Sequence, residues 1–123
     1  MLYDALITSL PGMDKSKPAP GPSFLKGYLE TQGFKIKVID GNQLDTLDNI
    51  HKEIAKYDFR WLGISVFSYE QKDDALKLGE RYENVLYGGS GVDIAWPSKY
   101  YITGEGEYAF VEFLNKNFDY PGI

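Results

Sequence analysis

Short apolar runs alternate with helix-like stretches along this chain of 123 residues. Residues 2–10 (LYDALITSL) and 61–67 (WLGISVF) are mostly apolar and have the length of a buried strand. Residues 34–39 (FKIKVI) alternate apolar and basic side chains, which is typical of a strand with one more exposed face near the edge of a sheet. Residues 84–87 and 100–103 resemble two further short strands, so the pattern predicts five in all.

Helices are predicted between most of these strands, where apolar residues recur at spacings of three and four. One spans residues 23–32, with Gly33 at its expected stop, and a second spans 48–57. A third follows Ser68, and a last helix covers 108–115.

Strands that alternate with helices indicate a parallel sheet with right-handed crossovers. We therefore predict an α/β fold, a three-layer flavodoxin-like (Rossmann-like) domain. Its parallel sheet would have five strands in the order 2-1-3-4-5. Residues 1–123 would form this single domain.

Composition narrows the possible functions. With 13 basic and 18 acidic side chains the net charge is -5, and no Lys/Arg run is present, which disfavours a nucleic-acid-binding surface. No apolar stretch approaches the ~20 residues of a membrane span, and the N-terminus lacks a signal-peptide pattern. We expect a cytoplasmic protein without a membrane partner.

The chain has no cysteine and one histidine, His51. It therefore contains no disulfide, thiolate zinc site, cysteine nucleophile or cysteine-ligated iron–sulfur cluster of its own. His51 is predicted to lie on a helix without a second ligand or base nearby, as a boundary residue.

Two glycine-rich turns are the most informative local feature. Gly88-Gly89-Ser90-Gly91 follows one predicted strand and Gly104-Glu-Gly-Glu107 follows the next. Because ligands of parallel α/β sheets bind outside the carboxyl ends of the strands, these turns predict a floor of exposed backbone for a large ligand.

Three residues at the end of the central strand face the same crevice: Ser65, Ser68 and Tyr69. One interpretation makes them hydrogen-bonding partners of a ligand. The other makes Ser68 a helix cap and Ser65 a small residue packed under a helix.

Other nucleotide and phosphate sites fit poorly. Gly104 to Ala109 matches G-x-G-x-x-G/A in letters, but that fingerprint belongs to the first strand–helix turn, whereas this match follows the last predicted strand. Glu105 and Glu107 would also repel a pyrophosphate. The paired acids of a phospho-receiver domain are missing, since the first strand ends in Thr8 and Ser9.

An ordered set of short motifs resembles the N-terminal cobalamin-binding-type domain of radical S-adenosylmethionine (SAM) enzymes. The set begins with the proline-rich first loop and then comprises Pro22-Ser-Phe-Leu-Lys-Gly-Tyr-Leu29, Gly33-Phe34, Val38-Ile-Asp40, Leu62-Gly-Ile-Ser65, Tyr87-Gly-Gly-Ser90, Trp96-Pro97 and Gly104-Glu-Gly-Glu107. Tyr120-Pro-Gly-Ile123 resembles the segment that leads into the radical domain, so we expect an N-terminal fragment of a longer protein.

The resemblance implies that cobalamin (vitamin B12) lies over the carboxyl edge of the sheet. Its nucleotide tail would reach Gly88, Gly89 and Ser90, with Ser65, Ser68 and Tyr69 nearby. The turn formed by Gly104, Glu105 and Gly106 would border the corrin ring.

The D-x-H-x-x-G motif that supplies a cobalt-ligating histidine in classical cobalamin domains is absent, as in many radical enzymes of this kind. The implied function is a cobalamin-binding module without a histidine ligand in a radical SAM enzyme, and methyl transfer (a methyltransferase) is the commonest reaction that the resemblance implies. SAM and the 4Fe-4S cluster would belong to a catalytic domain outside this chain, joined in cis or acting in trans. Two alternatives remain: a docking domain of the same fold without cofactor, and a nucleotide or flavin binder.

Overall fold

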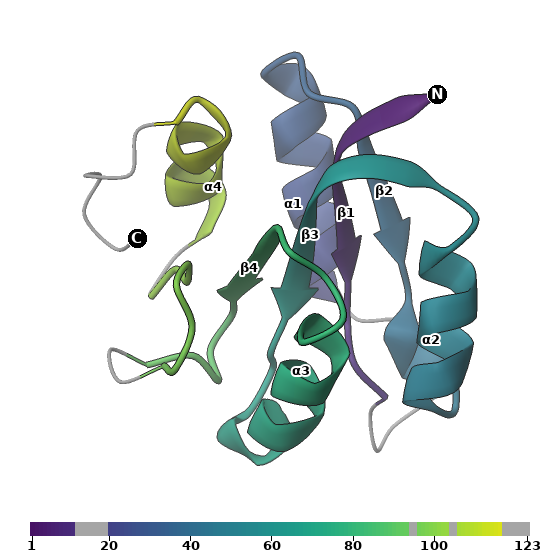
Figure 1. Cartoon of the computed structure of the whole chain (residues 1–123). Coiled ribbons are helices and arrows are strands. Elements are labelled where there is room, and N and C mark those ends of the chain that lie inside the picture. Colours follow the sequence, from purple (N-terminus) through teal and green to yellow (C-terminus); the bar gives the residue numbers. More distant parts are fainter. Residues whose placement is uncertain (12–19, 94–95, 104–105, 117–123) are drawn as a thin grey trace.

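The computed structural model describes residues 1–11, 20–93, 96–103 and 106–116 (Figure 1). Four strands and four α-helices alternate along them. In chain order they are β1 (Leu2–Thr8), α1 (Pro20–Thr31), β2 (Ile36–Ile39), α2 (Leu47–Ile54), β3 (Asp58–Ser65), α3 (Lys72–Gly79), β4 (Val85–Gly88) and α4 (Gly106–Leu114). None of the helices in these ranges is both long and apolar enough to cross a bilayer.

The strands form one parallel sheet in the order β2-β1-β3-β4, which confirms the α/β class and the predicted order of the first four strands. The central strand is β3, the apolar run of the sequence. Its register pairs Ile7 of β1 with Gly63, and Ser65 with Gly88 of β4. The carboxyl ends of β3 and β4 therefore lie next to each other.

The fifth predicted strand does not form within the described part of the chain. Residues 100–103 make one isolated parallel bridge, Tyr87 to Tyr101, in which the Ile102 N–H donates to the Tyr87 carbonyl at 2.8 Å. The partner strand β4 is only four residues long and turns away at Gly89, so it offers little backbone for a longer ladder.

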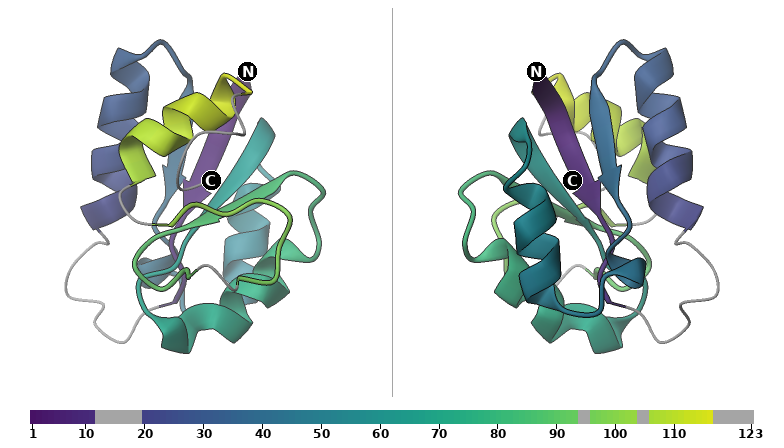
Figure 2. Two further views of the ribbon diagram at one scale, coloured as in Figure 1. Left: turned by 90° about the vertical axis from the view of Figure 1, so that its left-hand side faces the viewer. Right: turned by 90° about the vertical axis from the view of Figure 1, so that its right-hand side faces the viewer.

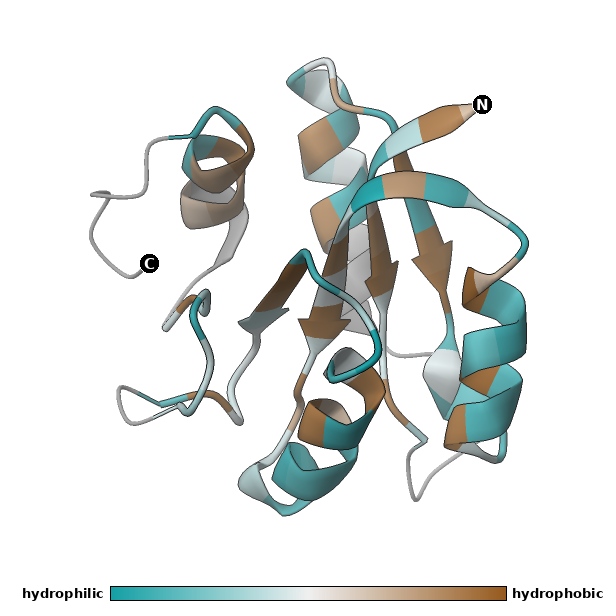
Figure 3. Cartoon of the chain, viewed as in Figure 1, coloured by the Kyte–Doolittle hydropathy of each residue, from teal (hydrophilic) through white to brown (hydrophobic). Residues whose placement is uncertain are grey.

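Two helices cover each face of the sheet (Figure 2). On one face, α2 and α3 pack through Ile50, Ile54 and Leu78 against the strands. On the other face, α1 and α4 pack through Leu29 and Phe113. In Figure 3 the carboxyl-terminal halves of β1 and β3 are largely brown, because these parts of the sheet are buried on both faces, whereas the amino-terminal part of β3 is mostly teal.

All four α-helices start at other residues than predicted: α1 at Pro20, α2 at Leu47, α3 at Lys72 and α4 at Gly106. Thr46 caps α2, with its hydroxyl accepting from the Asn49 N–H at 3.2 Å. Ser68 makes no side-chain cap hydrogen bond, and a 3₁₀ turn, Tyr69–Gln71, precedes α3. Gly33 does end α1, with φ +92°, as the sequence predicted.

Candidate ligand-binding edge of the sheet

The segments that follow β3 and β4 are bonded to each other at the carboxyl edge of the sheet. The Val66 N–H donates to the Gly88 carbonyl at 2.8 Å, and the Gly91 N–H donates to the Val66 carbonyl at 2.9 Å. The Ser90 hydroxyl donates a short hydrogen bond to the Phe67 carbonyl. The predicted residues of both segments are thereby held together at one edge.

Two glycines of this turn, Gly89 and Gly91, have no room for a side chain. At Gly89, φ is +113°, and a Cβ atom would collide with the Val66 carbonyl oxygen. At Gly91 a Cβ atom would lie 2.6 Å from the Ser68 carbonyl carbon. Both glycines are therefore required by the contact between the two loops, whatever binds above them.

Gly88 has more space. The nearest atom to a Cβ placed there is Cβ of Ile102, at 4.0 Å, which is an ordinary van der Waals contact. Gly88 and its register partner Ser65 are both half-buried. Together they form a strip of small residues at the ends of two neighbouring strands.

Two aromatic side chains project from the loop after β3. Phe67 is 78% exposed and Tyr69 is 60% exposed, whereas Val66 between Ser65 and Phe67 is fully buried. The Lys72 ammonium lies 5.1 Å from the Tyr69 ring centroid and 3.3 Å from its hydroxyl oxygen. Single exposed hydrophobic residues are common on protein surfaces, but here two aromatic rings from one loop add apolar surface to the edge that carries the small residues.

Sequence reasoning missed Phe67 as a site residue. The apolar run 61–67 ends at Phe67 and therefore predicts that this residue belongs to the strand. The strand ends at Ser65, so Phe67 belongs to the loop. The Phe67 N–H is held by the Gln71 side-chain oxygen at 2.9 Å, which fixes the loop in this position.

Six of the predicted site residues lie at this edge of the sheet: Ser65, Ser68, Tyr69, Gly88, Gly89 and Ser90. Gly106 is the first residue of α4, and Gly104 and Glu105 lie outside the described residues.

A polar group also gathers where β1 and β2 end. The Ser9 hydroxyl lies 3.4 Å from the Asp40 carboxylate and accepts from the Asn42 N–H at 3.2 Å. Asp40 directly precedes the 3₁₀ turn Gly41–Gln43. These contacts join the first two strand ends as the glycine turn joins the last two.

The single histidine, His51, belongs to a different part of the structure. His51 lies on α2, and its Nδ1 is 2.8 Å from the hydroxyl oxygen of Tyr82. Tyr82 belongs to the segment that joins α3 to β4. Burial, and secondarily the charge of Arg81, lower the pKa of His51, although Asp48 opposes them. Within the described ranges no three His, Cys, Asp or Glu side chains group to hold a metal ion.

The fold is similar to parts of known protein structures. One match is the radical S-adenosylmethionine methyltransferase TsrM from Kitasatospora setae with cobalamin and a [4Fe-4S] cluster bound, with a TM-score of 0.73 and 18% identity over 95% of this chain. Another is the apo form of the cobalamin-dependent S-adenosylmethionine radical enzyme OxsB, with a TM-score of 0.69 and 19% identity over 94% of this chain. The chain has the fold of one region of these enzymes.

This likeness confirms the fold that the resemblance implied. The chain covers 25% of the TsrM chain and 19% of the OxsB chain, so it spans a fifth to a quarter of the proteins it matches. No protein-family model matches the chain, and no curated protein matches it by sequence.

Proposed function

We propose that this chain is a cobalamin-binding module of a radical SAM protein. The observation that carries the proposal is the exposed aromatic pair Phe67 and Tyr69 beside the small residues Ser65 and Gly88, at the carboxyl edge of a parallel sheet. The fold shared with TsrM and OxsB supports it, because TsrM has been solved with cobalamin bound and OxsB is a cobalamin-dependent enzyme.

The edge fits a corrinoid in size and polarity. A large, mostly neutral macrocycle needs contact area and a few hydrogen bonds more than it needs charge. Phe67 and Tyr69 would offer apolar area to the ring. Ser65 and Ser68 would offer hydroxyl groups, and Gly88 would leave room for the nucleotide tail beside Ile102.

The corrinoid would be held without an imidazole ligand from this chain. The one histidine is bonded to Tyr82, and the first loop carries no D-x-H-x-x-G motif. The aromatic and hydroxyl groups of the edge would then hold the corrinoid in a His-off state. When bound, the corrinoid would supply methyl-transfer chemistry, and these residues would position it.

The remaining parts of such an enzyme would come from elsewhere. The cysteine-free chain has no thiolates for a 4Fe-4S cluster, so a radical SAM domain in cis or in trans would supply the cluster and SAM. Because TsrM is described as a methyltransferase, we propose methyl transfer as the reaction of the whole protein.

The test is retention of cobalamin by the purified protein. Protein mixed with hydroxocobalamin is passed through a desalting column, and corrin absorbance is measured in the protein fraction. We expect near-stoichiometric retention at micromolar concentrations. A colourless protein fraction would instead favour the docking domain without cofactor, and a parallel flavin titration by fluorescence tests the third alternative.

Two variants locate the site. Phe67→Ala should weaken retention about tenfold or more, the effect of losing one buried aromatic contact, while the exposed position leaves the fold intact. Leu2→Ala removes an apolar side chain that is 50% exposed at the amino end of β1 and should change nothing. Equal retention by wild type and Phe67→Ala would exclude this edge.

A further inference from the structure

A second hollow lies beside β4, away from the glycine turn. It is a pocket of about 480 Å³ between the carboxyl end of α3 and residues 97–100. Val85, the first residue of β4, lines it, whereas Gly88 at the other end of the strand belongs to the edge described above. The pocket opens on the face of the sheet that α2 and α3 cover, because Val85 and Tyr87 belong to that core.

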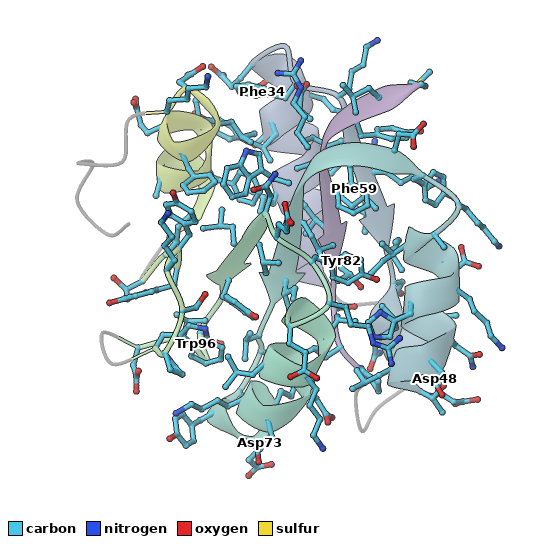
Figure 4. All side chains as sticks on the ribbon, in the orientation of Figure 1. Phe34, Asp48, Phe59, Asp73, Tyr82 and Trp96 are labelled. Carbon is cyan, nitrogen blue, oxygen red and sulfur yellow. The ribbon has the colours of Figure 1, made fainter. Side chains whose placement is uncertain are left out.

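The pocket exists because one crossover lacks a helix. Parallel strands are normally joined by a helix packed on the sheet, as α3 joins β3 to β4. The connection from β4 to the bridge at Tyr101 contains no helix in its described residues, 89–93 and 96–100. Val92 and Trp96, the latter labelled in Figure 4, cover part of the face instead. The ring centroids of Trp96 and Tyr87 lie 5.3 Å apart.

A hydroxyl without a partner reaches this pocket. Tyr87 lines the pocket, and only 4% of its surface is exposed. Its hydroxyl lies against Gly79, where a Cβ atom would collide with it, and it has no hydrogen bond within the described part of the chain. The rest of the side chain is buried, so this hydroxyl is the one polar atom of Tyr87 that a molecule in the pocket can reach.

The charges around the hydroxyl favour a cation. Glu80 and Glu83 line the pocket, and neither has an ion pair among the residues that the structure describes. Burial, and secondarily the negative charge of Glu80, raise the pKa of Tyr87, which places that carboxylate within electrostatic reach of the hydroxyl. Lys99 is the cation on the opposite wall, 5.2 Å from the ring centroid of Tyr100.

The walls suit an aliphatic stem. Leu76, Val85 and Pro97 contribute apolar surface, and Tyr82 and Tyr100 contribute aromatic rings. Tyrosine rings attract a cation over their faces, and carboxylates strengthen that attraction when the group is partly desolvated.

We propose that this pocket binds an alkyl cation, an ammonium or guanidinium group on a short aliphatic stem. The cation would lie between Glu80, Glu83 and the Tyr87 hydroxyl, with its stem against Val85. Such a group can come from a lysine or arginine side chain of a partner protein or from a free amine. The site is separate from the sheet edge, so corrinoid binding and cation binding are tested independently.

The experiment is an NMR titration of the ¹⁵N-labelled protein with two probes of the same shape. Butylguanidinium carries the charge, and butylurea is its neutral counterpart. We expect saturable shifts of the Tyr82, Tyr87 and Tyr100 amides with butylguanidinium in the millimolar range, as befits a ligand of so few atoms, and at least tenfold weaker shifts with butylurea. No saturation, or equal binding of the two probes, would overturn the proposal.

Variants with matched controls test the named groups. Glu80→Gln with Glu83→Gln should weaken binding of butylguanidinium about tenfold. Glu53→Gln with Glu70→Gln changes the net charge equally, outside the pocket lining, and should leave binding unchanged. Tyr87→Phe should weaken binding about threefold while the folded spectrum is retained, and Lys99→Gln should strengthen it. Unchanged binding by the Glu80 and Glu83 pair would overturn the proposal.

A third probe distinguishes the two sources of the cation. Nα-acetylarginine N-methylamide presents the guanidinium as a protein side chain does, with the backbone blocked on both sides. Binding comparable to that of butylguanidinium assigns the pocket to a partner's basic side chain. Binding of butylguanidinium alone assigns it to a small molecule that carries such a cation.

Discussion

Gly89 and Gly88 are adjacent in the chain but have opposite requirements. At Gly89 a side chain meets both an unfavourable φ of +113° and the Val66 carbonyl, so we predict that Gly89→Ala lowers the free energy of unfolding by about 2 kcal/mol or more. Gly88→Ala has room beside Ile102 and should cost less than about 1 kcal/mol. Urea denaturation of both variants checks the difference, and similar midpoints would contradict it.

This contrast decides how the corrinoid site is probed. A substitution at Gly89 removes ligand binding by distorting the loop contact, so its loss of binding carries no information about the ligand. Gly88→Ala keeps that contact and fills the space proposed for the nucleotide tail. It is the variant to use with hydroxocobalamin.

His51 makes the stability of the protein depend on pH in a defined window. Its folded-state pKa lies below the ordinary value of 6.5, so the folded protein resists protonation more than the unfolded chain does. Above pH 6.5 the ring is neutral in both states and contributes nothing. As pH falls through 6.5 the unfolded chain binds the proton first, and the free energy of unfolding falls until the folded-state pKa is passed.

The measurement is simple because the chain has one histidine. The imidazole C–H resonances should titrate with a midpoint below 6.5 without any assignment step. His51→Gln should lose this part of the pH dependence and keep the dependence due to carboxylates at lower pH. A midpoint above 6.5 would show that Asp48, which raises the pKa of His51, outweighs burial and Arg81.

Among the elements, α2 offers a clean test of a helix cap. The Thr46 hydroxyl accepts from the Asn49 N–H at 3.2 Å, and the residue is exposed. Thr46→Ala should therefore lower the free energy of unfolding by about 1 kcal/mol, since it leaves one N–H of the first turn without its partner. Thr46→Ser keeps the hydroxyl and should be close to wild type in urea, with the same m value in all three proteins.

The elements also show what sequence could and could not predict. The strands β1 and β3 followed from their apolar runs, because a strand buried on both faces reads that way in any context. Residues 100–103 have an equally strand-like sequence. They nevertheless form a single bridge, because the length of a strand pair depends on how far β4 continues. Strand propensity describes a segment, whereas a ladder needs two segments of matching length.

The candidate site, too, could be predicted from the sequence only in part. That serines and glycines meet at one sheet edge followed from the parallel topology alone. Sequence could not predict which glycine has free space around it, because that depends on the Val66 and Ser68 carbonyl groups of another loop. The exposure of Phe67 was hidden for a similar reason, because the end of β3 is set by pairing with β4.

At the scale of the whole molecule, corrinoid binding and folding are linked. A ligand that binds only the folded state, present at about 100 times its Kd, adds about 2.7 kcal/mol to the free energy of unfolding. For a domain of this size that raises Tm by about 10 °C. We predict such a rise with hydroxocobalamin, measured by circular dichroism with free ligand in excess.

Cobinamide, which lacks the nucleotide tail, separates the contributions of ring and tail in the same assay. If the tail lies beside Gly88 and Ser65, cobinamide should raise Tm less than hydroxocobalamin does, and Gly88→Ala should lower the response to hydroxocobalamin alone. If only the ring is bound, over Phe67 and Tyr69, the two ligands should act alike on wild type and Gly88→Ala. Phe67→Ala should reduce the response to both ligands in either case, because the ring is common to them, and an undiminished response would place the corrinoid elsewhere on the molecule.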